Sequence, residues 1–416
     1  MLSSANTAMA NGWKFGTTDY LYNTSSSGTF IADVENFDFN SQVMVIAMDL
    51  SRCTAGQRVN IFSIAGGSNE ANANSAVLSA TNGNALHVYF ENGTTPKFYL
   101  HNGSTEVTVT PTLSDLTNVL FSCEKGTGIR INSLDACWGN SLQSTFCDNT
   151  AFYSKAYYVF GRCSVTGVGN ATFKYTLKNS KNNSGTIELN DQTTYTEDWL
   201  KPRLGQWGTY KIMRTFNANT WYTFCSPVDL GINPCKEVLG NAKVRHLTSF
   251  DGNTLVFSEK TDHAFYGEPM LICPQTTVNT PTLTQRINNL VPMTVTKTNS
   301  NGESVQFVGT WSPAELQTGG KELFLGAGGK FFEPIEGENV MPGLRAYLKL
   351  PENVSPQMLR VSIDGVETSI SEIENGELLK SCDTRVFNLQ GQLMGNSLKG
   401  LQPGIYVQGG KKVLVK

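Results

Sequence analysis

The stretch Leu86-His-Val-Tyr-Phe-Glu-Asn-Gly-Thr-Thr-Pro-Lys-Phe-Tyr-Leu-His-Asn-Gly103 decides the fold class of this chain. Residues 86–90 alternate between apolar and other side chains, which is the period of a strand with one buried face, and residues 97–100 return after a turn. Asn92-Gly93 separates the two runs and Asn102-Gly103 follows the second. An Asn-Gly pair between two such runs is a strong hairpin signal. The stretch therefore predicts two antiparallel strands joined by a turn.

The same signal continues on both sides of this hairpin. Short runs rich in β-branched, aromatic and other apolar residues recur at intervals of 8 to 15 residues, and nothing before about residue 200 has a sustained helical period. This spacing is typical of an all-β sandwich or barrel. The predicted strands are 43–48, 59–64, 86–90, 97–100, 106–110, 118–122, 128–131, 157–160, 171–177 and 186–189.

The chain has 416 residues, enough for two or three domains. We expect an all-β protein with an N-terminal jelly-roll β-sandwich, a second β-rich domain and a small C-terminal β-sandwich tail. Glycine, proline and tryptophan cluster near residues 201–208 and suggest the first boundary, and an acidic stretch after residue 361 suggests a linker. The expected divisions are 1–205, 206–352, a linker over 353–381, and 382–416. One short helix is expected at 234–239, before Gly240.

Composition excludes several classes of protein. The net charge of −3 cannot recruit nucleic acid or an anionic membrane, and no apolar run is long enough to span a bilayer. The nine cysteines form no metal-binding spacing with the four histidines, so we expect no metal and no cofactor. The first ten residues carry neither a basic segment nor a long apolar one, so no secretory signal is visible.

The last thirty or so residues carry a recognisable motif. They contain Val386-Phe-Asn-Leu-Gln-Gly-Gln392, then Leu401-Gln-Pro-Gly-Ile-Tyr406, then Gly409-Gly-Lys-Lys-Val-Leu-Val-Lys416. In order, spacing and position, this set resembles the C-terminal sorting domain of the type IX (Por) secretion pathway of anaerobic Gram-negative bacteria. The resemblance implies export by an outward secretion machinery, a secreted or outer-membrane-surface location, and a signal peptide upstream of the sequence given. It assigns the sorting role to Gly391, Gly404, Tyr406, Lys411 and Lys412.

Two further resemblances cover the rest of the chain. Segments 214–227, 267–274, 307–313 and 341–350 resemble a module that often precedes such tails in surface proteins, with no chemistry attached to it. The strands between residues 41 and 161 resemble a laminin-G/concanavalin-like jelly roll. Together they imply a multidomain surface protein.

Saccharide binding is the function that this organisation favours. Aromatic rings stack on sugars and neutral amides bind hydroxyls, because such rings join an apolar body to a polar tip. The candidate ligand-binding residues are Trp138, Tyr89, Tyr99, Asn92 and Asn102, with Trp13 as a further aromatic. The partner is expected to be a glycan. The alternative is a structural or adhesive protein that contacts host or matrix proteins.

Catalysis is the third alternative, as a glycoside hydrolase. Asp33-Val-Glu35 places two carboxylates on one strand face, with Asp38 nearby, which is the nearest approach to a hydrolase pair. No G-x-S-x-G sequence and no phosphate-binding loop occurs. We therefore expect a non-catalytic protein.

Overall fold

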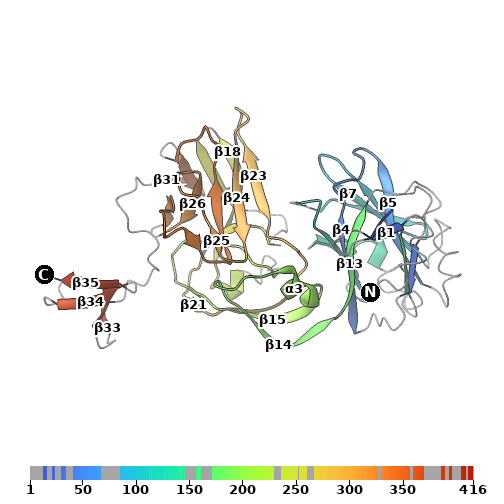
Figure 1. The fold of residues 1–416 in the computed structure, drawn as a ribbon, viewed down its shortest axis with the longest axis horizontal. Coiled ribbons are helices and arrows are strands. Elements are labelled where there is room, and N and C mark those ends of the chain that lie inside the picture. The colour runs from blue at the N-terminus through green and yellow to red at the C-terminus, as the bar shows by residue number, and fades with distance from the viewer. Residues whose placement is uncertain are drawn as a thin grey trace.

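The computed structural model confirms an all-β protein (Figure 1). The residues that it describes are 13–15, 21–23, 30–33, 41–66, 85–111, 113, 115–126, 128–132, 134–137, 139–143, 145, 156–160, 171–228, 236–251, 253–259, 267–326, 329–356, 359–369, 386–388, 393–395, 404–408 and 411–415.

The first unit is a sandwich of two antiparallel sheets around one apolar core. The seven-stranded sheet has the order β1-β2-β13-β4-β9-β10-β11, and the six-stranded sheet has the order β3-β12-β5-β6-β7-β8. The strands are β1 (Trp13–Phe15), β2 (Leu21–Asn23), β3 (Phe30–Asp33), β4 (Gln42–Asp49), β5 (Arg58–Gly66), β6 (Ala85–Glu91), β7 (Lys97–Asn102), β8 (Thr105–Val109), β9 (Val119–Glu124), β10 (Gly128–Ile131), β11 (Leu134–Asp135), β12 (Ala156–Phe160) and β13 (Thr172–Ser180).

The predicted hairpin is present. Strands β6 and β7 pair antiparallel from Leu86 opposite Asn102 to Glu91 opposite Lys97. Leu86, Val88 and Phe90 enter the sandwich core, together with alternate residues of β7. The alternation in the sequence therefore identified the residues of β6 that enter the sandwich core, while His87 and Tyr89 on the other face are buried as well.

Strand β4 is buried on both of its faces. Met44, Ile46 and Met48 pack into the sandwich core, whereas Val43, Val45 and Ala47 pack into a second core shared with residues 189–344. A strand covered on both sides has a continuous apolar sequence, which is what Val43–Met48 shows.

A buried ion pair accompanies this second core. Glu124 at the end of β9 lies 2.5 Å from the guanidinium of Arg286, and each side chain is 2% exposed. The Arg286 guanidinium also lies 4.3 Å from the ring centroid of Trp207, which is a cation–π contact. Gly205 lies so close to β4 that a Cβ there would meet a Val43 methyl group at 2.9 Å. The first sandwich and the following unit are thus packed against each other.

The following unit contains a second sandwich. A six-stranded sheet, β17-β20-β18-β19-β30-β31, and a five-stranded sheet, β23-β24-β29-β26-β27, enclose a core that includes Phe257, Phe307 and Leu348. The strands are β17 (Tyr222–Phe224), β18 (Lys243–Asp251), β19 (Thr254–Ser258), β20 (Met270–Cys273), β23 (Thr294–Thr298), β24 (Ser304–Thr310), β26 (Glu322–Leu325), β27 (Phe331–Phe332), β29 (Arg345–Lys349), β30 (Arg360–Ile363) and β31 (Val366–Ser369).

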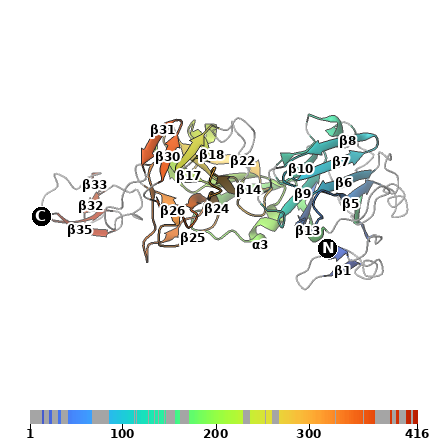
Figure 2. The ribbon, with the colours of Figure 1, turned by 90° about the horizontal axis from the view of Figure 1, so that it is seen from above.

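Smaller sheets and short helices complete this unit. Both views show α3, β14 and neighbouring strands between the two sandwiches (Figures 1 and 2). Residues 236–238 are helical, within the predicted helix, and Gly240 follows with φ of 71°. The elements are α3 (Glu197–Leu200), the 3-10 helix η3 (Lys201–Arg203), β14 (Asn182–Leu189), β15 (Trp207–Ile212), β16 (Thr215–Phe216), β21 (Val278–Asn279), β22 (Thr282–Arg286), β25 (Ala314–Glu315) and β28 (Val340–Met341).

Two expected divisions differ from the structure. Strand β14 lies within the predicted first domain, 1–205, yet it pairs in parallel with β15 and belongs to the sheet β14-β15-β22 of the second unit. Strands β30 and β31 lie within the predicted linker, 353–381, yet β30 pairs in parallel with β19 and extends the second sandwich. Both pairings are parallel: β14 reaches β15 through a crossover that contains α3 and η3, and β30 pairs with β19, which lies far back in the sequence. Neither pairing has a hairpin turn that the sequence could reveal.

The C-terminal tail consists of β-strands, as expected. Strands β32 (Val386–Asn388), β33 (Leu393–Gly395), β34 (Gly404–Gln408) and β35 (Lys411–Val415) make one antiparallel sheet of order β33-β32-β34-β35. Within the described residues this is a single sheet, where a small sandwich was expected. Tyr406 is buried.

The four segments that resemble a surface-protein module meet in the second unit. The Cys225 thiol donates to the Gly267 carbonyl, 3.1 Å away, and a Cβ at Gly309 would lie 2.6 Å from the Cys225 sulfur. A Cβ at Gly343 would lie 2.1 Å from the Trp311 carbonyl oxygen. Small residues are required at these positions because other parts of the chain fill the space. Close packing therefore explains why glycine stands at these positions of the four segments.

Replacing Glu124 tests the interface between the two units. Glu124→Gln removes the carboxylate charge that lies 2.5 Å from the buried Arg286 guanidinium, so we expect a loss of about 3–5 kcal/mol in the free energy of unfolding. The control is Glu188→Gln, since Glu188 lies 4.0 Å from Lys211 on the surface and should contribute less than about 1 kcal/mol. Urea unfolding measures both, and equal stabilities would contradict the inferred role of the buried pair.

Candidate functional site

The outer side of the six-stranded sheet carries a set of polar and aromatic residues that we call the polar face. Residues directly opposite each other in antiparallel strands lie on the same side of the sheet. Tyr89 is opposite Tyr99, His87 opposite His101, and His101 opposite Glu106, while their sequence neighbours enter the core. The polar face consists of Arg58, Asn60, Ser63, His87, Tyr89, Glu91, Lys97, Tyr99, His101, Glu106 and Thr108.

A β-bulge brings residues of β5 onto this face. The register shifts between Asn60 and Phe62, so that Ile61 and Phe62 both enter the core and Ser63 returns to the outer side opposite His87. The Asn60 side chain donates to the carbonyls of Phe62 and Val88, at 3.3 Å each. These hydrogen bonds hold the bulge in place.

Arg58 is the centre of the exposed part of the polar face. Its guanidinium lies 4.6 Å from the ring centroid of Tyr89 and 4.1 Å from that of Tyr99. Its two terminal nitrogens donate to the two carboxylate oxygens of Glu106, at 3.2 Å and 2.5 Å. This fork geometry, supported by two rings, fixes the position of the guanidinium.

A second acidic residue flanks this cluster. The Tyr99 hydroxyl donates to Glu91, 2.7 Å away, and the Lys97 ammonium lies 4.0 Å from the same carboxylate. The hydrogen bond to Glu91 is the main cause that raises the pKa of Tyr99, and burial adds to it. Tyr99 therefore stays a neutral hydrogen-bond donor.

The deeper part of the polar face is fully buried. Ser63 Oγ and His87 Nδ1 are hydrogen-bonded at 2.9 Å, and both residues have no exposed surface. The His101 ring lies 6.1 Å from the His87 ring, between centroids. Burial, followed by the proximity of His87, lowers the pKa of His101, while Glu106 opposes that shift. Because Ser63 is inaccessible, the Ser63–His87 pair supports the site and does not act as a nucleophile.

The structure brings together two of the five predicted ligand-binding residues. Tyr89 and Tyr99 are directly opposite each other in β6 and β7, and the Arg58 guanidinium lies over both rings; Tyr89 is 3% exposed. Asn92 donates to the Cys53 carbonyl at 2.8 Å and fixes the turn, so its amide is not directed at a ligand. Asn102 is 2% exposed and donates to the Ala85 carbonyl, so its predicted binding role is wrong. Trp138 and the side chain of Trp13 lie outside the described part of the chain.

Sequence reasoning missed Arg58, Glu91, His87, His101 and Glu106. The alternation that placed Tyr89 and Tyr99 on one side also places His87, Glu91 and His101 there, so these three could have been found. Arg58 could not, because its position depends on the bulge in β5 and on the pairing of that strand with β6.

Other candidate sites offer less chemistry. Asp33 ends β3, and Glu35 and Asp38 lie outside the described residues, so the predicted carboxylate pair is not tested. Within the described residues no cluster of histidine, cysteine and acidic side chains could hold a metal ion, and no helix is long and apolar enough to cross a bilayer.

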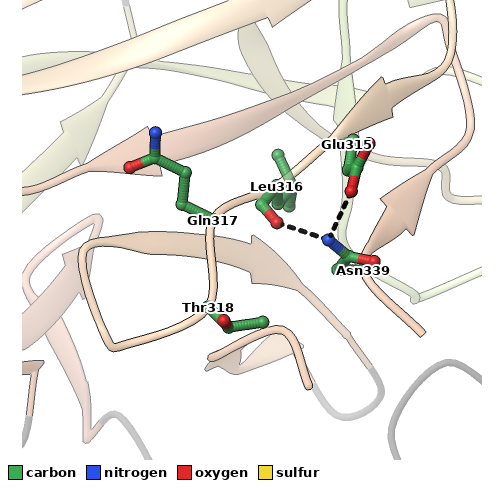
Figure 3. A pocket seen from close by; sticks show the side chains of 5 residues that line it. All are labelled: Glu315, Leu316, Gln317, Thr318 and Asn339. Atoms are coloured by element: carbon green, nitrogen blue, oxygen red, sulfur yellow. Dashed lines mark hydrogen bonds between the residues drawn. The ribbon is translucent and has the colours of Figure 1, made fainter. Parts of the chain in front are cut away.

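A shallow pocket lies beside β25 and β28 (Figure 3). It is lined by Glu315, Leu316, Gln317, Thr318 and Asn339. The Asn339 amide donates to the Glu315 carboxylate at 3.3 Å and to the Leu316 carbonyl at 2.9 Å. These bonds join the two segments to each other, and the lining brings no second charged group to the pocket. The polar face is the stronger candidate.

Comparisons with known proteins do not assign a family. No protein-family model and no curated protein matches the chain. A solved structure described as a bifunctional GH43-CE protein of Bacteroides eggerthii matches with a TM-score of 0.24 and 13% identity. The match covers 41% of this chain and 22% of that chain. At this TM-score, the likeness carries no argument about function.

His101 should make stability depend on pH. Because folding lowers the pKa of His101, the unfolded chain binds the proton more readily, so stability is full above the ordinary pKa of 6.5 and falls as the pH drops below it. We expect the thermal midpoint to decrease between pH 7.5 and 5, and His101→Gln to reduce that decrease. Calorimetry at several pH values measures it, and an unchanged pH dependence in the variant would contradict the assignment.

Proposed function

We propose that this chain is a secreted or cell-surface, non-catalytic protein that binds carbohydrate through the polar face of its first sandwich. The observation that carries the proposal is the Arg58 guanidinium, which lies over the rings of Tyr89 and Tyr99 and is bonded to Glu106. Tyr89 is 3% exposed and the Arg58 guanidinium lies over both rings, so the two tyrosines support the site from below. What the face offers a ligand is a preorganised set of donors and acceptors, Arg58, Glu106 and Glu91, which matches a ligand rich in hydroxyls.

The arrangement supports binding better than catalysis. The charged residues of the polar face are engaged with partners: Arg58 with Glu106, and Glu91 with both Tyr99 and Lys97. The one serine–histidine pair on this face is buried. A ligand can thus be held by hydrogen bonds at the rim, while the buried residues keep the floor rigid.

Two observations support export. Cys137 is disulfide-bonded, and disulfides persist in oxidising compartments outside the cytosol. The segments that carry the resemblance to a sorting domain contain β32, the start of β34 and β35, with Gly404 starting β34 and Lys411 and Lys412 starting β35. Gly391 lies outside the described residues.

Binding of polysaccharides by the full chain tests the proposed function. Arg58→Ala removes charge-assisted donors and the stacked guanidinium, so we expect affinity for a bound polysaccharide to fall roughly tenfold to a hundredfold. The matched control is Arg203→Ala, since Arg203 lies 4.3 Å from the ring centroid of Trp199, away from the polar face.

The panel should include plant, microbial and animal polysaccharides, with affinities from calorimetry or affinity electrophoresis. If no polysaccharide binds and the chain instead binds matrix or cell-surface proteins, the adhesive alternative replaces the proposal. Equal loss in both arginine variants would exclude the polar face as the binding site.

Export is tested separately in a bacterium that possesses the type IX pathway. The full chain, placed behind an export signal, should become accessible to protease at the cell surface. Removal of residues 411–416 deletes an edge strand of the tail sheet, so the protein should be retained inside. Lys178→Ala, at an exposed residue of β13, is the control. Surface exposure of the truncated chain would contradict the sorting role of the tail.

A further inference from the structure

The charges of the polar face indicate whether it suits an acidic or a neutral saccharide. This inference rests on the proposed function. The face carries two permanent cations, Arg58 and Lys97, and two carboxylates, Glu91 and Glu106. Each cation lies against a carboxylate, Arg58 at 2.5 Å from Glu106 and Lys97 at 4.0 Å from Glu91. The permanent charges therefore cancel locally.

An acidic saccharide would meet an unfavourable environment here. To reach the guanidinium of Arg58 with its carboxylate or sulfate, it would have to displace Glu106 and then lie beside that displaced negative charge. Two negative charges within a few ångströms repel each other, and the energy of this repulsion grows as water is excluded from between them. The stack on Tyr89 and Tyr99 also prevents Arg58 from turning away to meet a ligand elsewhere.

A neutral saccharide meets paired donors and acceptors instead. A carboxylate has about four acceptor positions, so Glu106 retains acceptor capacity after binding Arg58, and Glu91 retains it after binding Tyr99. A guanidinium has five N–H donors, of which the contacts with Glu106 use two. Each hydroxyl of a sugar is both a donor and an acceptor, so adjacent hydroxyls can bond to a carboxylate acceptor and to a neighbouring guanidinium donor.

We propose that the polar face binds a neutral, hydroxyl-rich saccharide, with the Glu106–Arg58 pair contacting adjacent hydroxyls as acceptor and donor. Glu91, held by the Tyr99 hydroxyl, supplies the second acceptor. Partial exposure of Arg58 and Glu106, at 34% and 37% of their side chains, leaves this pair accessible to such a ligand.

The variant Glu106→Gln gives opposite results for the two classes of ligand. For a neutral saccharide, it removes charge-assisted acceptors, and we expect affinity to fall about tenfold. For an acidic saccharide, it removes the competing carboxylate from Arg58 and would raise affinity. The probes are neutral polysaccharides, a galactan, a mannan and a β-glucan, and acidic ones, a polygalacturonate and a sulfated glycan.

A second variant keeps the test informative if Glu106→Gln fails to fold. Lys97→Ala removes a cation from the face. It should change the affinity for a neutral saccharide by less than about twofold, and it should clearly reduce the affinity for an acidic saccharide. Raising the salt from 0.05 to about 0.5 M should likewise leave a neutral ligand bound, because screening weakens only charge attraction. Arg203→Ala is again the control.

The outcomes separate the two proposals. Binding of acidic probes alone, strengthened by Glu106→Gln or weakened by Lys97→Ala, would overturn the neutral-ligand inference and leave carbohydrate binding standing. Absence of binding to every probe, or binding that neither Arg58→Ala nor Glu106→Gln alters, would overturn the proposed function as well. Neutral binding weakened by Glu106→Gln supports both.

Discussion

The structure depends on one strand that serves two cores. Alternate residues of β4 pack into the first sandwich and into the core shared with the second unit. The outer side of the seven-stranded sheet is thereby covered, and the buried Glu124–Arg286 pair lies at the same interface. Desolvation offsets much of the attraction within such a buried pair, whereas removal of one partner alone is costly. The outer side of the six-stranded sheet is the one that carries the polar face.

The sequence predicted those elements whose signals are local. The 86–103 hairpin, the strands around it and the four tail strands follow from alternation and from Asn-Gly or glycine turns. The division at residue 205 and the linker after 353 did not hold, because β14 and β30 pair in parallel with strands distant in sequence or separated by a crossover. Parallel pairing leaves no turn signature between the partners.

The candidate site shows the same limit. Tyr89 and Tyr99 could be placed together because a hairpin register follows from its turn, whereas Arg58 required the three-dimensional pairing of β5. Asn102 was misassigned because its position after the strand suggested a turn, while its amide actually bonds to Ala85 inside the sheet. The motif segments around Cys225, Trp311 and Gly343, to which the sequence analysis attached no chemistry, are packed closely against one another. A motif in a sequence can therefore record a steric requirement without any chemistry.

The bulge in β5 has a consequence for comparing related chains. Without the one extra residue between Asn60 and Phe62, every position on one side of the bulge would exchange inside for outside, and Arg58 would point into the sandwich core. Loss of a single codon at this point would thus remove Arg58 from the polar face, although no residue of the face was itself replaced. In an alignment of related chains, a gap between the positions of Asn60 and Phe62 would therefore say more about ligand recognition than the identities of the aligned side chains.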